Sequence, residues 1–220
     1  MADVNGTGLK EAEQVDWDNY NPGSKYTRPP VPVLNETTAD GQPRLRTFYG
    51  QVNGVKVDEK PDNQGFRQYV IDPIKVTKSG ADADGYEIRF SRASVRKFRN
   101  KKTGEPINAS MVGNILKGAA VTAKPQRNAD YDAAMNLIKG RIVPFTADWS
   151  AYDKETGERV DGYANFPDDP ERPGQKLAIL KTGDTYLDKD GVKQTVKAQV
   201  MFANLRVKFF LDPSKGRKTT

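Results

Sequence analysis

The chain has 220 residues, which suits one domain of ordinary size. It contains neither cysteine nor histidine, which excludes disulfides, thiolate zinc sites, histidine-ligated metals and catalysis by a histidine base. With 35 basic and 29 acidic residues its net charge is +6, and no apolar run is long enough for a transmembrane helix. We therefore expect a protein that is not an enzyme, holds no cofactor or metal, and stays in the cytoplasm away from membranes.

The charge is distributed unevenly along the chain. Residues 1–43 hold three basic and seven acidic side chains, so the remainder carries a net charge of +10. The densest basic stretch contains Arg89, Arg92, Arg96 and Lys97 with no acid between them, and a second basic cluster ends the chain. Two such clusters favour a polyanionic partner, because neutralising phosphates releases counterions. A membrane surface fits less well, since neither cluster lies on a long amphipathic helix.

The chain begins with a segment that differs from the rest. Residues 1–43 are rich in Pro, Gly, Asn and Thr and lack a sustained hydrophobic period, so we expect a disordered acidic and aromatic tail. From residue 44 onward the residue pattern is typical of short strands, at 44–58, 66–78 and 86–91. A folded domain is therefore expected over 44–212, followed by a short basic tail.

Two of these runs indicate which side chains share a face. In the second run Arg67, Tyr69 and Lys75 have the same parity and mix aromatic with basic groups. In the third run Tyr86 and Phe90 alternate with charged residues, which predicts that both lie in the core.

The middle of the chain changes to a helical period. Apolar residues recur three and four positions apart in 108–120 and again in 128–140. A strand-like pattern returns at 141–153, whereas 154–196 is an insertion with turns and an irregular loop. The order of these segments predicts a mainly β fold with two short helices between the third and fourth strands.

The last run, 200–211, has two different faces. One face is wholly apolar and is expected in the core: Met201, Ala203, Leu205, Val207, Phe209 and Leu211. The other face mixes aromatic and basic groups: Val200, Phe202, Asn204, Arg206, Lys208 and Phe210. Bases stack on flat side chains and cations follow phosphates, so this second face predicts a site for single-stranded nucleic acid.

The candidate binding residues follow from these patterns. We expect base stacking by Tyr69, Trp149, Phe202 and Phe210. Phosphate contacts are expected from basic residues on the same runs and in the basic stretch: Arg67, Arg89, Arg92, Arg96, Lys97, Arg206 and Lys208. The alternative is that the helices or the 154–196 insertion cover the aromatic side chains.

Several segments together carry a resemblance to a known family. They are Gly85–Phe90, the helix MVGNILKGAA, the helix-to-strand segment Met135–Trp149, the segment Asp161–Phe166 and the closing strand. Their order over 44–212 resembles the OB-fold single-stranded DNA-binding proteins of bacteriophages. The resemblance implies an OB-type Greek-key barrel that binds single-stranded DNA without strong sequence preference, in phage replication or recombination.

One feature departs from that family. Its members commonly end in an acidic tail that recruits replication proteins and competes for the DNA groove. This chain ends in a basic segment, 213–220, and its acidic, aromatic segment lies at 11–20 instead. We expect 11–20 to take the competing role.

Three alternatives stay open from the residues alone. A virion structural or decoration protein would also be β-rich and free of cysteine and histidine. A metal-dependent nuclease would have to use carboxylates alone, for which Asp58 and Glu59 after a strand are a weak pattern. An RNA-binding protein has the same composition as a DNA-binding one, because a contact to the 2′-hydroxyl leaves no mark in the sequence.

Overall fold

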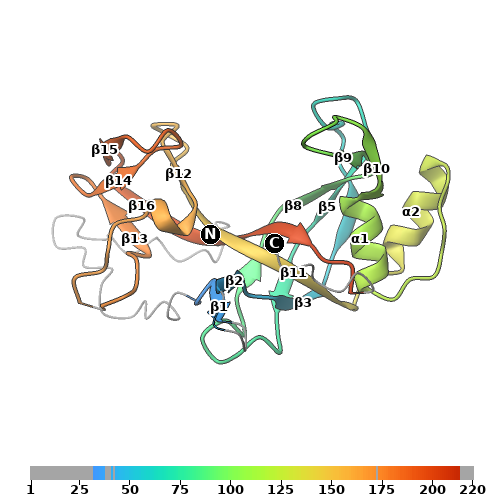
Figure 1. The fold of residues 1–220 in the computed structure, drawn as a ribbon, viewed down its shortest axis with the longest axis horizontal. Helices are drawn as coiled ribbons and strands as arrows, with labels where there is room; N and C mark the ends of the chain where they lie inside the picture. Colours follow the sequence, from blue (N-terminus) through green and yellow to red (C-terminus); the bar gives the residue numbers. More distant parts are fainter. Residues whose placement is uncertain (1–31, 38–40, 42, 172, 214–220) are drawn as a thin grey trace, which may run out of the picture.

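The computed structural model describes residues 32–37, 41, 43–171 and 173–213, and this part is mainly β with two α-helices. The long strands β11 (Ile142–Tyr152) and β16 (Val200–Phe210) run side by side through the middle of the molecule (Figure 1). The helices lie at one end of these strands, and residues 154–196 form a lobe at the other end (Figure 1). The predicted mainly β class is confirmed.

Three strands early in the domain are bent, and each contributes to two sheets. The half-strands are β3 (Phe48–Val52) with β4 (Val55–Val57), β5 (Gln68–Ile71) with β6 (Ile74–Val76), and β7 (Glu87–Ile88) with β8 (Ser91–Ser94). The strands β3, β6 and β7 belong to a central seven-stranded sheet, whereas β4, β5 and β8 form a three-stranded sheet. The bends contain Gly54, Pro73 and Phe90, of which Phe90 has a φ of 53°.

The later strands complete the central antiparallel sheet in a Greek-key order. The fourth long strand, β11, pairs with the first bent strand through β3, and β16 pairs with β11. The strand β16 also passes close to β7, but no backbone pairing joins the two among the described residues. The expected barrel is therefore an open arrangement of sheets, with the core enclosed between them.

Two short helices occupy the predicted place between the third and fourth strands. Ser110 is the N-cap of helix α1 (Met111–Gly118), and its hydroxyl accepts a hydrogen bond from the Gly113 amide at 3.0 Å. The helix α2 (Asn128–Asn136) follows after a loop over 119–127. Both helices are too short to be stable in isolation, so they depend on packing their apolar faces against the sheets.

The 154–196 lobe extends the central sheet at the end away from the helices. Its strand β12 (Arg159–Asp161) pairs with β11, and β13 (Ile179–Lys181) pairs with β16. A 3₁₀ turn, η2 (Tyr163–Asn165), and a hairpin of β14 (Thr185–Leu187) and β15 (Lys193–Thr195) complete the lobe. The inserted segment thus enlarges the surface of the sheet.

The folded domain begins earlier than residue 44. The strand β1 (Asn35–Thr37) pairs with β2 (Pro43–Leu45), and Leu34 is buried in the core. Three-residue strands carry no periodic signal, which is why the predicted boundary at 43 is too late. The parts of the predicted tails at 1–31 and 214–220, including the acidic segment 11–20, lie outside the described residues.

An ion pair fixes this first segment to the rest of the domain. The Arg46 guanidinium donates to the Val33 carbonyl at 3.0 Å and to the Asp82 carboxylate at 2.6 Å. The Val33 amide also donates to Asp82 at 3.0 Å. One carboxylate therefore joins the start of the domain to the turn before β7.

This ion pair predicts a dependence of stability on pH. Hydrogen bonds from Arg46 hold the pKa of the Asp82 carboxyl below its ordinary value of 3.8. Such a group stabilises the fold above its unfolded-state pKa, and the contribution is lost as pH falls through the folded-state pKa. We expect Asp82→Asn to lower Tm at neutral pH and to flatten the fall in Tm between about pH 5 and pH 3. Thermal unfolding of both proteins measures this, and parallel Tm curves would contradict it.

Candidate nucleic-acid interface

A β-bulge near the end of β16 changes the predicted faces of that strand. The register between β11 and β16 shifts by one residue, which leaves Lys208 as an extra residue on β16. Before the bulge the side chains follow the predicted alternation, and after it they are inverted. Phe210 is 1% exposed and packs on Phe145, with ring centroids 6.3 Å apart, whereas Phe209 is exposed. The prediction that Phe210 stacks on bases is wrong, and Phe209 is the exposed ring at this end of the strand.

We call the side of the central sheet that points away from the core the outer face. Cross-strand partners share a face, so the pairing of the strands gives its members. On β16, β11, β12 and β13 they are Val200, Phe202, Asn204, Arg206, Lys208, Phe209, Thr146, Asp148, Ser150, Tyr152, Arg159, Asp161, Ile179 and Lys181. Towards the helices the face continues with Tyr49, Gln51 and Lys75.

Four aromatic side chains are exposed on the outer face. They are Tyr49, Tyr152, Phe202 and Phe209, and each is between 43% and 49% exposed. Phe202 was predicted at this place. Single exposed rings are ordinary on a protein surface, but four on one sheet face are typical of a surface that binds a partner.

Basic side chains lie among these rings. Burial lowers the pKa of Arg206, the nearby positive charge of Arg159 lowers it further, and Asp161 acts in the opposite direction. The Asp161 carboxylate therefore partly offsets the repulsion between these two guanidinium groups. The Arg159 guanidinium also contacts Asp161 at 2.5 Å, and the Lys208 ammonium contacts Asp148 at 3.4 Å. Of the predicted residues, Phe202, Arg206 and Lys208 are thus brought together here.

Two other predicted residues, Arg67 and Tyr69, have a structural role. Tyr69 is buried, and its hydroxyl donates to the Asp132 carboxylate of α2 at 2.6 Å. Arg67 donates two hydrogen bonds to the same carboxylate, at 2.9 and 2.6 Å. Burial raises the pKa of Tyr69, and its bond to Asp132 raises it further. The prediction that Tyr69 stacks on bases is wrong, because its ring belongs to the core that holds α2.

Trp149 is also on the core side of its strand. It is buried, and its ring contacts Tyr86 edge to face with centroids 6.2 Å apart. The prediction of stacking by Trp149 is therefore wrong. Tyr86 packs against the core as predicted, but Phe90 is exposed, because the bend between β7 and β8 interrupts the alternation.

The fold divides the basic stretch that was dense in the sequence. Arg89, Arg92 and Arg96 each contact a carboxylate, at 2.7, 2.8 and 3.5 Å respectively. Lys97 is exposed on a hairpin of β9 (Lys97–Arg99) and β10 (Pro106–Ser110) that was not predicted (Figure 1). The three arginines are therefore weaker candidates for phosphate contacts than Arg206.

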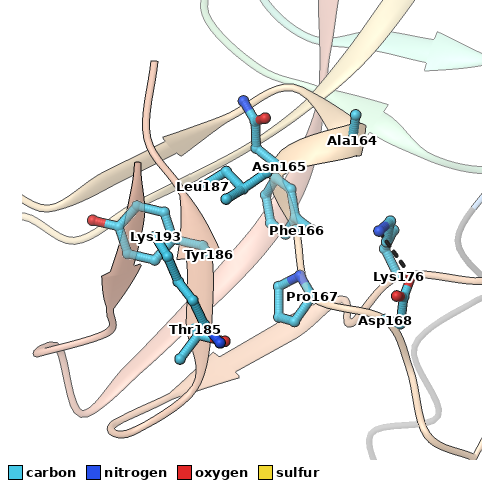
Figure 2. Close-up of a pocket in the computed structure, with 10 residues that line it drawn as sticks. All are labelled: Ala164, Asn165, Phe166, Pro167, Asp168, Lys176, Thr185, Tyr186, Leu187 and Lys193. Carbon is cyan, nitrogen blue, oxygen red and sulfur yellow. Dashed lines mark ion pairs between the residues drawn. The ribbon is translucent and has the colours of Figure 1, made fainter. Parts of the chain in front are cut away.

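The lobe contains a small pocket of about 150 Å³. Figure 2 shows it between the segment after η2, where Phe166 lies, and the hairpin that carries Tyr186 and Leu187. Lys176 and Asp168 form an ion pair at its edge at 2.8 Å, so these two charges neutralise each other (Figure 2). Lys193 also lines the pocket, but the pocket is small, so the outer face is the stronger candidate site.

The described residues bear on metal binding and on membrane insertion. Nowhere in them do three Asp or Glu side chains gather closely enough to hold a metal ion. The Asp58 carboxylate, part of the weak nuclease pattern, contacts the Arg92 guanidinium. No helix in this part of the chain has the length and apolar character needed to cross a membrane.

The sequence reasoning missed three of the four outer-face rings for different reasons. Tyr49 follows the buried Phe48 in β3, so the period of two could have placed it outside. Tyr152 ends a strand that is buried on both faces for most of its length, which conceals the alternation. Phe209 was assigned to the core because a bulge leaves no signal in the local pattern.

Comparison of the chain with protein-family models, with curated proteins and with solved structures finds no match. The interpretation of the outer face therefore depends on its own chemistry.

Proposed function

We propose that the chain is a single-stranded DNA-binding protein without strong sequence preference, and that the outer face is its binding surface. The observation that carries this proposal is the gathering of four exposed rings with Arg159, Arg206 and Lys208 on one sheet face. Each stacked base contributes about 1–3 kcal/mol whatever its identity. Such a protein would protect or organise single strands during replication or recombination, in the cytoplasm of a phage-infected cell.

The chemistry of the face suits a single strand better than a duplex. Bases in a duplex are stacked on each other, so a protein ring reaches their flat sides only after unpairing, which costs a few kcal/mol. A sheet face with separated rings and cations between them accepts bases that are already unpaired. The same face would accept single-stranded RNA, which makes RNA an outcome to be measured.

A titration at several salt concentrations tests the proposal. We expect Arg159, Arg206, Lys208 and Lys181 to make roughly three or four phosphate contacts, so log K should fall with log salt at a slope of about −2 to −3. Between 50 and 200 mM salt the affinity for labelled dT20 should therefore fall about 15- to 60-fold. Fluorescence anisotropy measures it, with duplex DNA and rU20 as comparisons. Tighter binding to the duplex, or self-assembly without salt-sensitive binding as in a virion structural protein, would contradict the proposal.

A single substitution tests whether Arg206 contacts a phosphate of the bound strand. Arg206→Ala should reduce the steepness of the salt dependence by about 0.7, because one phosphate contact is lost. Lys124→Ala is the matched control, since Lys124 is exposed in the loop between the helices and lies outside the sheet. Its slope should equal that of the unaltered protein. Equal slopes for Arg206→Ala and the unaltered protein would remove Arg206 from the binding surface.

A further inference from the structure

We infer that the outer face binds two separate groups of bases of one strand, one near each end of β16, with phosphates between them. This inference rests on the proposed function and adds the arrangement of the bound strand. Tyr152 and Phe202 form the lobe-end pair, and Tyr49 and Phe209 form the helix-end pair.

The lobe-end pair makes a continuous apolar surface. Ala151 pairs with Ala203, so the next residues along, Tyr152 and Phe202, are cross-strand neighbours. Side chains at such positions have Cβ atoms about 5 Å apart, which is close enough for one base to contact both rings. Arg159 is the partner of Tyr152 on the other side and places a positive charge beside the ring.

The helix-end pair lies on the two strands that flank β11. Tyr49 pairs with Pro144, and Phe209 pairs with Thr146, two positions further along the same strand. Pro144 and Thr146 are buried between the two rings. Pro144 packs against Gly118 of α1, so the exposed rings of Tyr49 and Phe209 stand on either side of a filled surface, and bases would stack on the rings themselves.

The surface between the two pairs has a different chemistry. Its exposed members on β16 contain no ring and are Asn204, Arg206 and Lys208, with the Asp148 carboxylate beside the Lys208 ammonium. Amide and cationic groups donate hydrogen bonds to phosphate oxygens but offer no flat surface to a base. The order along β16 is therefore ring, cations, ring, which fits bases at both ends and the sugar–phosphate backbone in the middle.

The spacing of the pairs sets the length of strand that reaches both. Six residues of β11 separate Tyr152 from Thr146, the partner of Phe209, which corresponds to about 20 Å in a strand. A stacked single strand rises about 3.4 Å per nucleotide, so about six stacked nucleotides span the gap, and fewer when the strand is extended. The oligonucleotide dT3 is thus expected to occupy one pair at a time, whereas dT20 occupies both.

Affinities of Phe202→Ala, Phe209→Ala and the double variant for dT3 and dT20 test this inference. With dT20 each single change should weaken binding about 5- to 150-fold, and the two factors should multiply in the double variant. With dT3 each single change should weaken binding by no more than about twofold, because the other pair still binds. Only the double variant should lose most of its dT3 binding. Calorimetry or NMR titration measures the weak dT3 complexes.

The control variant is Phe66→Ala. Phe66 is exposed in the turn before β5 and lies outside the strands, so its removal should change neither affinity. If Phe202→Ala weakens dT3 and dT20 by the same large factor, the face is one continuous site and the inference is overturned, although DNA binding stands. If the unaltered protein does not bind dT20 at low salt, the proposed function itself fails. Circular dichroism checks folding, and Phe209→Leu, which keeps apolar volume without a ring, replaces a variant that does not fold.

Discussion

Replacing Phe209 and Phe210 one at a time is expected to separate DNA binding from stability. Phe210→Ala removes a buried ring that packs on Phe145, so the free energy of unfolding should fall by about 3–5 kcal/mol. Phe209→Ala removes an exposed ring, so stability should change by no more than about 0.5 kcal/mol. Its affinity for dT20 should nevertheless fall about 5- to 150-fold.

The contrast is large because the two rings have different surroundings. Phe145 contacts Phe210 on one side and stacks on Phe48 on the other, with centroids 5.8 Å apart. The Phe210 carbonyl also accepts a hydrogen bond from Asn114 of α1 at 3.0 Å. Removing the Phe210 ring therefore leaves a cavity where β16, β11 and α1 meet.

Urea denaturation and dT20 titration of both variants measure these effects. Folded Phe210→Ala protein should bind dT20 with nearly unchanged affinity. The opposite pattern, with Phe209→Ala destabilised and Phe210→Ala deficient in binding, would mean that β16 continues without a bulge. It would also remove Phe209 from the outer face.

The architecture could be predicted from the sequence where hydrophobic periods are long. The helical period of 108–120 and 128–140 placed two helices correctly between strands. The bends at Gly54, Pro73 and Phe90 have no comparable signal, because they depend on how two sheets meet. For that reason the strand runs were recognised, but their division between two sheets was not.

The site was predicted only in part, for reasons that are also physical. Alternation placed Phe202 and Arg206 correctly, because pleating is regular up to Lys208. Basic residues that were predicted to bind phosphates from their density in the sequence are instead paired with carboxylates that the fold brings from distant positions. Arg67 meets Asp132, which is far away in the sequence, and the sequence pattern cannot show that the two are neighbours.

Gly54→Ala is the second substitution with a large expected effect, because Gly54 lies where the first bent strand passes from one sheet to the other. The Asp72 amide donates to the Gly54 carbonyl at 3.0 Å, and the Asn53 amide donates to the Pro73 carbonyl at 2.9 Å. The bends of two neighbouring strands are thus held together by their main chains. A methyl group on Gly54 would collide with the main-chain oxygen of Asp72.

A main-chain oxygen cannot rotate away as a side chain can, so relief requires the two bends to separate. We expect Gly54→Ala to lower the free energy of unfolding by about 1–3 kcal/mol or more, measured in urea. Gly113→Ala is the control, because its added methyl would meet only the Ser110 hydroxyl, at 3.2 Å, and should change stability by no more than about 1 kcal/mol. The folded fraction should keep its dT20 affinity, since Gly54 lies outside the outer face. A Gly54→Ala protein as stable as the parent would mean that the bends are not in contact, and the division of these strands between two sheets would be wrong.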